Sequence, residues 1–327
     1  MKKQIIAVAI AAAVAAPAAM AGAPTVYGQI NMSIDSVTDK GVTVNSNASR
    51  IGVKGAEDLG NGLKAIYKME WGVDVAGGNG ATAKEKLGAR NAYVGLAGGF
   101  GAVLLGRHDT PTKIAQPTDM FNDGLGDLKP MSGGLGILGA AGEIRAANVV
   151  AYVSPSFNGI KLIAAGVSPD AFGKNTNLAN AYSIAVMYGS KKKGLYLSGG
   201  YDSFDKHVTG AKTFTEYRLA AQYTMGDLMG NIMYANYDDG QSTDSANEGS
   251  NWQVNVAYTI GAATLKGKYS SVNYKPSGMK DAAGLGLGVD YALGKKTTAY
   301  VEYVNYDKHM TGTKSVDNIS VGLIHKF

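Results

Sequence analysis

Hydrophobic and polar residues alternate along most of the chain after residue 24. In the segment NWQVNVAYTIG (251–261), Trp252, Val254 and Ile260 share one face, and polar or small residues occupy the other. A period of two is typical of a β-strand. Sixteen such segments predict sixteen strands, over residues 25–36, 49–57, 63–75, 88–98, 102–109, 147–155, 160–168, 179–189, 195–204, 213–226, 228–239, 251–261, 263–274, 283–294, 298–307 and 316–327.

The connections between these segments fall into two kinds. Short turns are expected at 58–62, 98–101, 154–159, 190–194, 226–227, 261–262 and 294–296, and longer polar loops at 37–48, 76–87, 169–178, 205–212, 240–249 and 308–315. Short turns on one side and long loops on the other are typical of an outer-membrane barrel whose turns face the periplasm. An even number of strands places both chain ends on that side.

The two faces of the strands suit a membrane barrel. One face carries Val, Ile, Leu, Ala and Tyr, and the other carries charged and polar residues. A soluble sandwich would show the same alternation with its polar face outward. The segments are close to the ~9–11 residues of a tilted membrane-spanning strand, and tyrosine is frequent at their ends, as an interfacial girdle requires. The pattern therefore predicts an all-β, antiparallel transmembrane barrel with a water-filled interior.

One long connection, at about 109–145, stands apart as the candidate constriction loop. It contains prolines, many glycines, apolar residues and the aspartates Asp119, Asp123 and Asp127. Structureless loops beyond ~12–15 residues are usually functional or disordered. Because ionised side chains avoid hydrocarbon, the strand registers place a basic cluster inward. Its members are Arg50, Lys54, Lys68, Arg90 and Arg145. If the loop folds inward, its aspartates would oppose this cluster across the pore.

The N-terminal segment 1–21 reads as a cleavable signal peptide. Lys2 and Lys3 precede an uncharged, Ala-rich run that ends in Ala19-Met20-Ala21. The alternative, a membrane anchor, is disfavoured because the run is short for a spanning helix. The barrel would then occupy residues 22–327, and loss of the two lysines lowers the formal net charge from +5 to +3. That bias is too weak to favour nucleic-acid binding.

Several stretches taken together resemble the general diffusion porins of Gram-negative outer membranes, particularly the neisserial-type group. The stretches are VYGQINMSID, SRIGVKGAEDLGNGLKAIYKMEWG, RNAYVGLAGGFGAVLLGRHDTP, YVSPSFNGIKL and the terminal VGLIHKF. The resemblance implies a sixteen-stranded barrel with its third loop folded inside and a homotrimer in contact with outer-membrane lipid and lipopolysaccharide. It also implies that Phe327 is the signal read by the outer-membrane assembly machinery. The enterobacterial loop motif Pro-Glu-Phe-Gly-Gly is absent, and PTDMFNDGLGD (117–127) stands in its place.

These patterns predict a passive channel for small hydrophilic solutes and ions, selective by charge at the constriction. The alternative is a substrate-selective porin for anions or small nutrients. An outer-membrane lipase is disfavoured because Ser320 and His325 fall on opposite faces, and an adhesin role of the long loops stays open. The match GGLGILG (133–139) lacks a strand–helix context, and the four histidines lack zinc-ligand spacing. No cofactor and no metal are expected.

Overall fold

The computed structural model describes residues 23–39, 41–77, 87–127, 144–168, 180–205, 212–238, 240, 248–275, 280–311 and 314–327. The predicted signal peptide lies outside these residues and stays a prediction. Within the described ranges, neither helix is long and apolar enough to cross a membrane. The two helices are α2 (Pro111–Ala115) and α6 (Lys308–Thr311).

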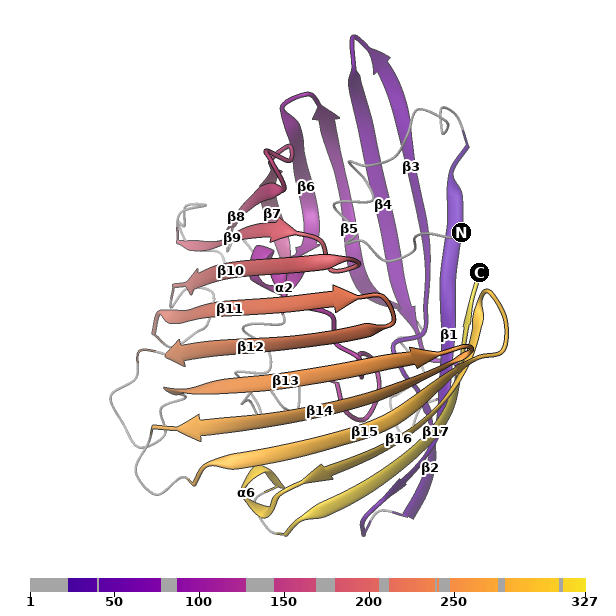
Figure 1. Ribbon diagram of the computed structural model, residues 1–327. Coiled ribbons are helices and arrows are strands. Elements are labelled where there is room, and N and C mark those ends of the chain that lie inside the picture. Colours follow the sequence, from indigo (N-terminus) through magenta and orange to yellow (C-terminus); the bar gives the residue numbers. More distant parts are fainter. Residues whose placement is uncertain are drawn as a thin grey trace.

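The strands form one antiparallel sheet that closes on itself (Figure 1). They are β1 (Thr25–Val37), β2 (Gly41–Ser46), β3 (Arg50–Gly60), β4 (Leu63–Val73), β5 (Leu87–Gly98), β6 (Gly101–Asp109), β7 (Arg145–Val153), β8 (Ile160–Val167), β9 (Ala181–Gly189), β10 (Gly194–Phe204), β11 (Phe214–Met225), β12 (Leu228–Asp238), β13 (Glu248–Ile260), β14 (Ala263–Tyr274), β15 (Ala282–Ala292), β16 (Thr297–Tyr306) and β17 (Val316–Lys326). Closure is complete because β1 pairs with β17, with Gln29 opposite Lys326. A closed barrel has no unpaired strand edge, which is what a bilayer demands.

The seventeen segments occupy sixteen strand positions, so the predicted sixteen-stranded antiparallel barrel is confirmed. Segments β2 and β3 share one position: β2 pairs with the end of β1 from Met32 to Val37, and β3 pairs with its beginning from Thr25 to Gln29. The prediction of a continuous loop over 37–48 is wrong at this point. Its alternation, GVTVNS, is only six residues long, which is too short to separate a strand from a polar loop by pattern alone.

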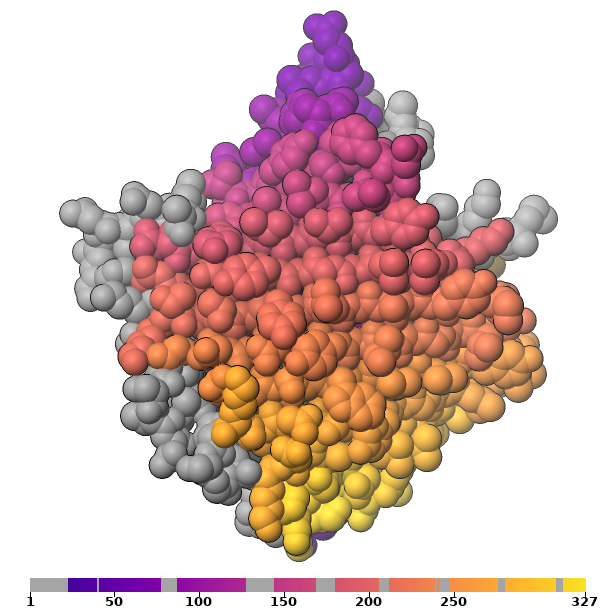
Figure 2. Space-filling model, turned by 60° about the vertical axis from the view of Figure 1, so that its left-hand side comes forward, coloured from indigo at the N-terminus to yellow at the C-terminus, as the bar shows by residue number. Residues whose placement is uncertain are grey.

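The outer face of the barrel is apolar, and its aromatic residues are unevenly distributed. Within the described strands β16, β17 and β1–β6 the exposed large hydrophobic residues are aliphatic or Met, and Tyr67, Trp71 and Tyr303 are only half-exposed. Phe100 and Phe327 are exposed at the ends of these strands. Figure 2 shows the outer surface over the later strands, coloured red to yellow. Exposed aromatic residues on β7–β15 include Tyr152, Tyr188, Tyr201, Tyr217, Tyr223, Trp252, Tyr258, Tyr269 and Tyr291.

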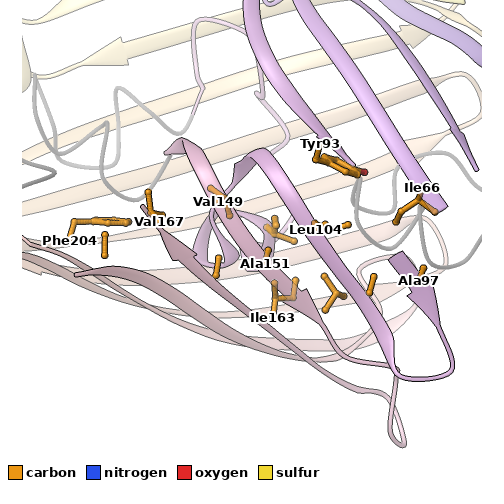
Figure 3. Close-up of a cluster of buried hydrophobic side chains, with 14 of the residues drawn as sticks. Ile66, Tyr93, Ala97, Leu104, Val149, Ala151, Ile163, Val167 and Phe204 are labelled. Carbon is orange, nitrogen blue, oxygen red and sulfur yellow. The ribbon is translucent and has the colours of Figure 1, made fainter. Parts of the chain in front are cut away.

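One sector of the inner wall is apolar. Buried side chains of β4–β8, among them Leu104, Ala151 and Ile163, form a cluster that Ile114 of α2 joins (Figure 3). Small alanines at several of these inward positions leave room for a segment to lie close to the wall. The sequences of β7 and β8 carry apolar residues on both faces, which is the pattern of a strand buried on both sides. The start of the third long loop packs against this apolar sector.

Candidate functional site

The third long loop begins with α2, directly after β6. The local sequence favours the start of a helix at this point. The Thr110 hydroxyl accepts a hydrogen bond from the backbone N of Lys113, and Pro111 stands in the first helical turn. A threonine cap followed by proline is a strong helix start. In Figure 1, α2 lies behind β9 and β10, within the ring of strands.

Residues 112–118 are bound to inward-facing side chains of β9–β12. The Thr112 hydroxyl donates to Oδ1 of Asp202 over 2.8 Å, and the Tyr196 hydroxyl donates to the carbonyl of Ala115 over 2.7 Å. The backbone N of Thr118 donates to Oε1 of Gln222 over 2.8 Å. Gln222 and Asp202, the partners of Thr118 and Thr112, are both almost fully buried. Each bond satisfies a loop backbone or hydroxyl group that would otherwise be buried without a partner.

Residues 119–127 continue along the wall past β14, β15 and β16. The ring of Phe121 lies over Gly286 of β15, where an added Cβ would come within 3.1 Å of the ring. Nζ of Lys266 donates to the carbonyl of Met120 over 3.0 Å and lies 4.8 Å from the Phe121 ring centroid. The described part of the loop therefore follows the inner surface of the barrel, and residues 128–143 lie outside the described residues.

The predicted basic residues on β4 and β5 converge on one carboxylate, Glu70. Nζ of Lys68 lies 3.0 Å from Oε2 of Glu70, and Nε of Arg90 lies 2.6 Å from Oε1. The Tyr27 hydroxyl donates to the same Oε2 over 2.8 Å. The ammonium of Lys54 lies over the Tyr27 ring, 5.2 Å from its centroid. Two cations and a phenol thus share one carboxylate, and Lys54 adds a further cation beside them.

Arg145 links the two ends of the loop, where β6 ends and β7 begins. Its Nη2 lies 3.1 Å from Oδ1 of Asp109, and its Nε donates to Oδ1 of Asn91 over 2.8 Å. Lys113 of α2 also approaches Asp109, with 3.3 Å between Nζ and Oδ1. Arg145 is therefore both an inward cation, as its register predicts, and a tie between the two strands that carry the loop.

The three predicted aspartates have three different surroundings. Asp123 meets the basic wall, since its Oδ2 lies 3.1 Å from Nη1 of Arg50. Asp119 is bound instead to Nζ of Lys268 on β14 over 3.1 Å, and its side chain is 4% exposed. Oδ2 of Asp127 accepts the backbone N–H of Asp123 over 2.7 Å, which fixes the turn between them. The geometry brings Asp123 together with Arg50 of β3 and holds Asp119 against Lys268 of β14, further along the inner surface.

Exposure separates the charges that face water from those that pin the loop. The side chains of Arg50 and Arg90 are 22% and 21% exposed, whereas Lys266 and Lys268 are 4% and 0% exposed. The wall group, which we define by its mutual contacts, comprises Arg50, Lys54, Lys68, Arg90, Lys113 and Arg145 with the carboxylates of Glu70, Asp109 and Asp123. Lys68 and Glu70 are themselves buried. Six cations against three carboxylates leave a local charge of +3.

Phe327 lies at the seam where the barrel closes. Its backbone N donates to the carbonyl of Gly28 over 3.1 Å and its carbonyl accepts the N–H of Gly28 over 3.3 Å. An added Cβ on Gly28 would come within 2.4 Å of the Phe327 ring, so the ring packs directly on this glycine. The terminal residue is thus fixed by both backbone and side chain.

Sequence reasoning did not select Glu70, Asp109 or Asn91 as site residues, although they hold the cations in place. Glu70 was readable as inward from its register beside Lys68. Asp109 and Asn91 carry no such signal, because their contacts depend on how β5, β6 and β7 are aligned. No group of three or more His, Cys, Asp or Glu residues suited to a metal ion occurs in the part of the chain that the structure describes.

Comparison with known proteins gives a consistent result. A family model described as Gram-negative porin matches residues 7–309. The chain is 29% identical over 363 residues to a major outer membrane protein P.IB of Neisseria meningitidis serogroup B and 27% identical over 365 residues to that of Neisseria gonorrhoeae. Each alignment covers 100% of both chains.

Solved structures share the fold at low sequence identity. An anion-selective porin from Comamonas acidovorans has a TM-score of 0.72 at 22% identity, covering 93% of this chain and 99% of that chain. A loop-deletion mutant of OmpT, an outer membrane protein of Vibrio cholerae, also has a TM-score of 0.72, at 19% identity, covering 94% of this chain and 100% of that chain.

Proposed function

The chain belongs to the Gram-negative porins, and from this premise we propose that residues 110–127 form the constriction of its pore and give it a preference for anions. It is an outer-membrane protein that forms a water-filled channel for passive diffusion of small hydrophilic solutes. Porins are passive channels, and the family is not one of enzymes. What the channel admits is then decided by the narrowest charged region along its length.

The observation that carries the proposal is the contact between Asp123 and Arg50. It joins the loop to the basic wall at 3.1 Å, so opposite charges from two parts of the chain face each other inside the barrel. The pair places charges of both signs on the inner surface beside the path of a solute, and low-dielectric walls focus the field of such charges. We assign Arg50, Lys68, Arg90 and Arg145 to the basic wall of the constriction, with Asp123 in contact with Arg50.

The sign of the preference follows from the exposed charges. The +3 charge of the wall group attracts anions, whereas the ammonium groups of Lys266 and Lys268 are buried against the loop and neutralised by carboxylates. A porin of the same fold from Comamonas acidovorans is itself described as anion-selective. A channel for anionic nutrients, the narrower alternative, would use the same cations and differ by saturating at low solute concentration.

Single substitutions on the two sides of the contact test the constriction. In planar bilayers under a KCl gradient, Arg50→Gln shifts the reversal potential toward cations, because one water-facing cation is lost. Asp123→Asn shifts it toward anions, because one opposing carboxylate is lost. Two shifts of the same sign, or none, would contradict the assignment of these residues to the constriction.

The outer surface supports a homotrimer, which we also propose for this chain. Aromatic girdles mark the lipid interfaces of a membrane barrel, and exposed aromatic residues are fewer on the face formed by β16, β17 and β1–β6, where Phe100 and Phe327 lie at the strand ends. That face is suited to packing against other copies of the chain. One similar solved structure is described as a trimer form of OmpT from Vibrio cholerae.

We further propose that Phe327 is read by the outer-membrane assembly machinery and that residues 1–21 are removed on export. The first rests on the terminal aromatic at the seam, the second on the charged start and the Ala-x-Ala site. Contacts with lipid follow from the apolar outer face, and contacts with lipopolysaccharide are expected at the side that carries the long loops.

A further inference from the structure

The short turn 190–194, between β9 and β10, is joined to the loop by side chains inside the barrel. Its sequence, SKKKG, indicates a solvated turn, and Lys192 and Lys193 are exposed. Lys191 differs: it is partly buried, its Nζ donates to the carbonyl of Ile114 in α2 over 3.3 Å, and it lies over the Tyr196 ring at 5.1 Å from the centroid. A turn on the periplasmic side thus contacts the end of α2.

Gln222 of β11 bridges the same two segments with both ends of its amide. Its Nε2 donates to the carbonyl of Lys191 over 2.6 Å, and its Oε1 accepts the backbone N–H of Thr118 over 2.8 Å. The side chain is 2% exposed, so these bonds form away from water. Nδ2 of Asn231 donates to the carbonyl of Thr118 over 2.8 Å and completes the backbone bonding of that residue.

Tyr196 binds the loop at Ala115, next to Ile114. Its hydroxyl donates to the carbonyl of Ala115 at the end of α2, and the ring is 4% exposed. The end of a helix leaves carbonyls without intrahelical partners, so a buried donor there decides where the helix can end. Between them, Tyr196 and Gln222 bind the backbone at residues 115 and 118, on either side of the point where the loop leaves α2.

We propose that Gln222 and Tyr196 are positioning residues of the constriction, which tie residues 115–118 to the turn 190–194 and so set how far the loop extends into the pore. The inference rests on the proposed role of residues 110–127 as the constriction. Neither residue faces the permeating solute. They act through the loop backbone, because a buried donor or acceptor left without its partner destabilises the bound position of the loop.

Two variants remove these bonds with little change in volume: Gln222→Met and Tyr196→Phe. Losing one buried hydrogen bond raises the population of the displaced loop about fivefold or more. We therefore expect more open-channel current noise, more visits to sub-conductance levels, and a reversal potential closer to zero, in both variants. The fraction of folded protein is expected to stay as in the wild type. If the two residues only stabilised the barrel, the variants would lose folded protein, and the channels that still assembled would carry wild-type currents.

Matched controls separate this effect from a general loss of packing. Gln253→Met changes an equally buried glutamine on β13, 2% exposed, and Tyr223→Phe changes an outward tyrosine of β11. Both controls are expected to give wild-type currents. Should Gln222→Met fail to assemble, Tyr196→Phe decides the matter, since it deletes a single oxygen atom.

Wild-type noise and reversal potential in Gln222→Met and Tyr196→Phe would overturn the inference. Altered currents in the two controls of the same size as in the variants would overturn it too, because burial alone would then explain them. Failure of the constriction itself looks different: Arg50→Gln and Asp123→Asn would leave the reversal potential unchanged whatever the Gln222 variant does.

Discussion

The absence of a side chain at Gly28 lets the Phe327 ring lie across the barrel seam. A Cβ at this position would come within 2.4 Å of the ring and 2.5 Å of the Arg50 carbonyl oxygen. The carbonyl cannot move without disturbing the pairing of β1 with β3. The last residue of the chain is therefore specified by a glycine near its beginning.

We expect Gly28→Val to lower the yield of assembled barrel by destabilising closure, by about 1–3 kcal/mol for a forced overlap in a packed region. Heat-modifiable mobility on gels measures the folded fraction. Gly88→Val is the matched control, because a Cβ at that strand glycine would have open space around it. An assembly yield for Gly28→Val equal to that of the control would show that the seam tolerates the overlap.

At the scale of elements, the turn 190–194 carries a lysine that is unusual for a surface turn. Burial lowers the pKa of Lys191 to about 8. The groups around its ammonium are the Ile114 carbonyl of α2 and the Tyr196 ring of β10, with Lys192 and Lys193 beside it in the turn. The turn therefore holds a charge that the folded protein accommodates poorly.

This burial predicts a pH dependence of stability with a definite sign. The pKa of an unfolded lysine is about 10.4, so between about pH 8 and pH 10 the unfolded chain binds more protons at Lys191 than the folded chain. The contribution of this group to the free energy of unfolding then rises with pH across that window. Urea midpoints at pH 7.5 and pH 9.5 measure it. Lys191→Arg stays charged and is expected to lack the rise, and equal rises in both proteins would refute the prediction.

The strands and their inward charges could be predicted from the sequence, because period two fixes which face each residue occupies. Lys68, Arg90 and Arg145 have the orientation that this rule gives. The partners could not be predicted, because the path of an irregular loop does not follow a period. Asp119 and Asp123 are four residues apart, yet Lys268 binds the first and Arg50 the second.

The apolar sector of the inner wall could have been predicted from the sequence, from strands that carry apolar residues on both faces. Strands β7 and β8 are apolar on both faces, which a simple barrel with a polar lumen does not require. Leu104 and Ile163 are 1% exposed there, in the cluster that Ile114 joins. A strand pair without polar alternation inside an otherwise alternating barrel indicates that something packs against its inner face.

For the whole molecule, the uneven girdle predicts which face is shared between copies. Val94 of β5 and Leu219 of β11 are both outward and both 56% exposed, on the aliphatic and the aromatic side respectively. We expect Val94→Trp to convert trimers to monomers on semi-native gels, because the larger ring obstructs subunit packing. Leu219→Trp is expected to stay trimeric, since lipid accommodates the ring. Trimers in both variants would contradict the assignment of this face.

Two triple variants test whether selectivity depends on the position of the charges or only on the total charge of the protein. Replacing Arg50, Arg90 and Arg145 together by Gln removes three cations from the wall group and takes its charge from +3 to 0. Replacing Lys280, Lys295 and Lys296 by Gln removes the same charge from exposed turns and loops outside it. The two triple variants have equal net charge, so they differ only in where the charge is lost.

The reversal potential of these two variants in planar bilayers under a KCl gradient is the most direct measurement of the central claim. The account predicts anion preference in the wild type, a clear shift toward cations in the Arg50, Arg90 and Arg145 variant, and a much smaller shift in the turn variant. A wild-type reversal potential in the arginine variant, or equal shifts in both variants, would contradict it.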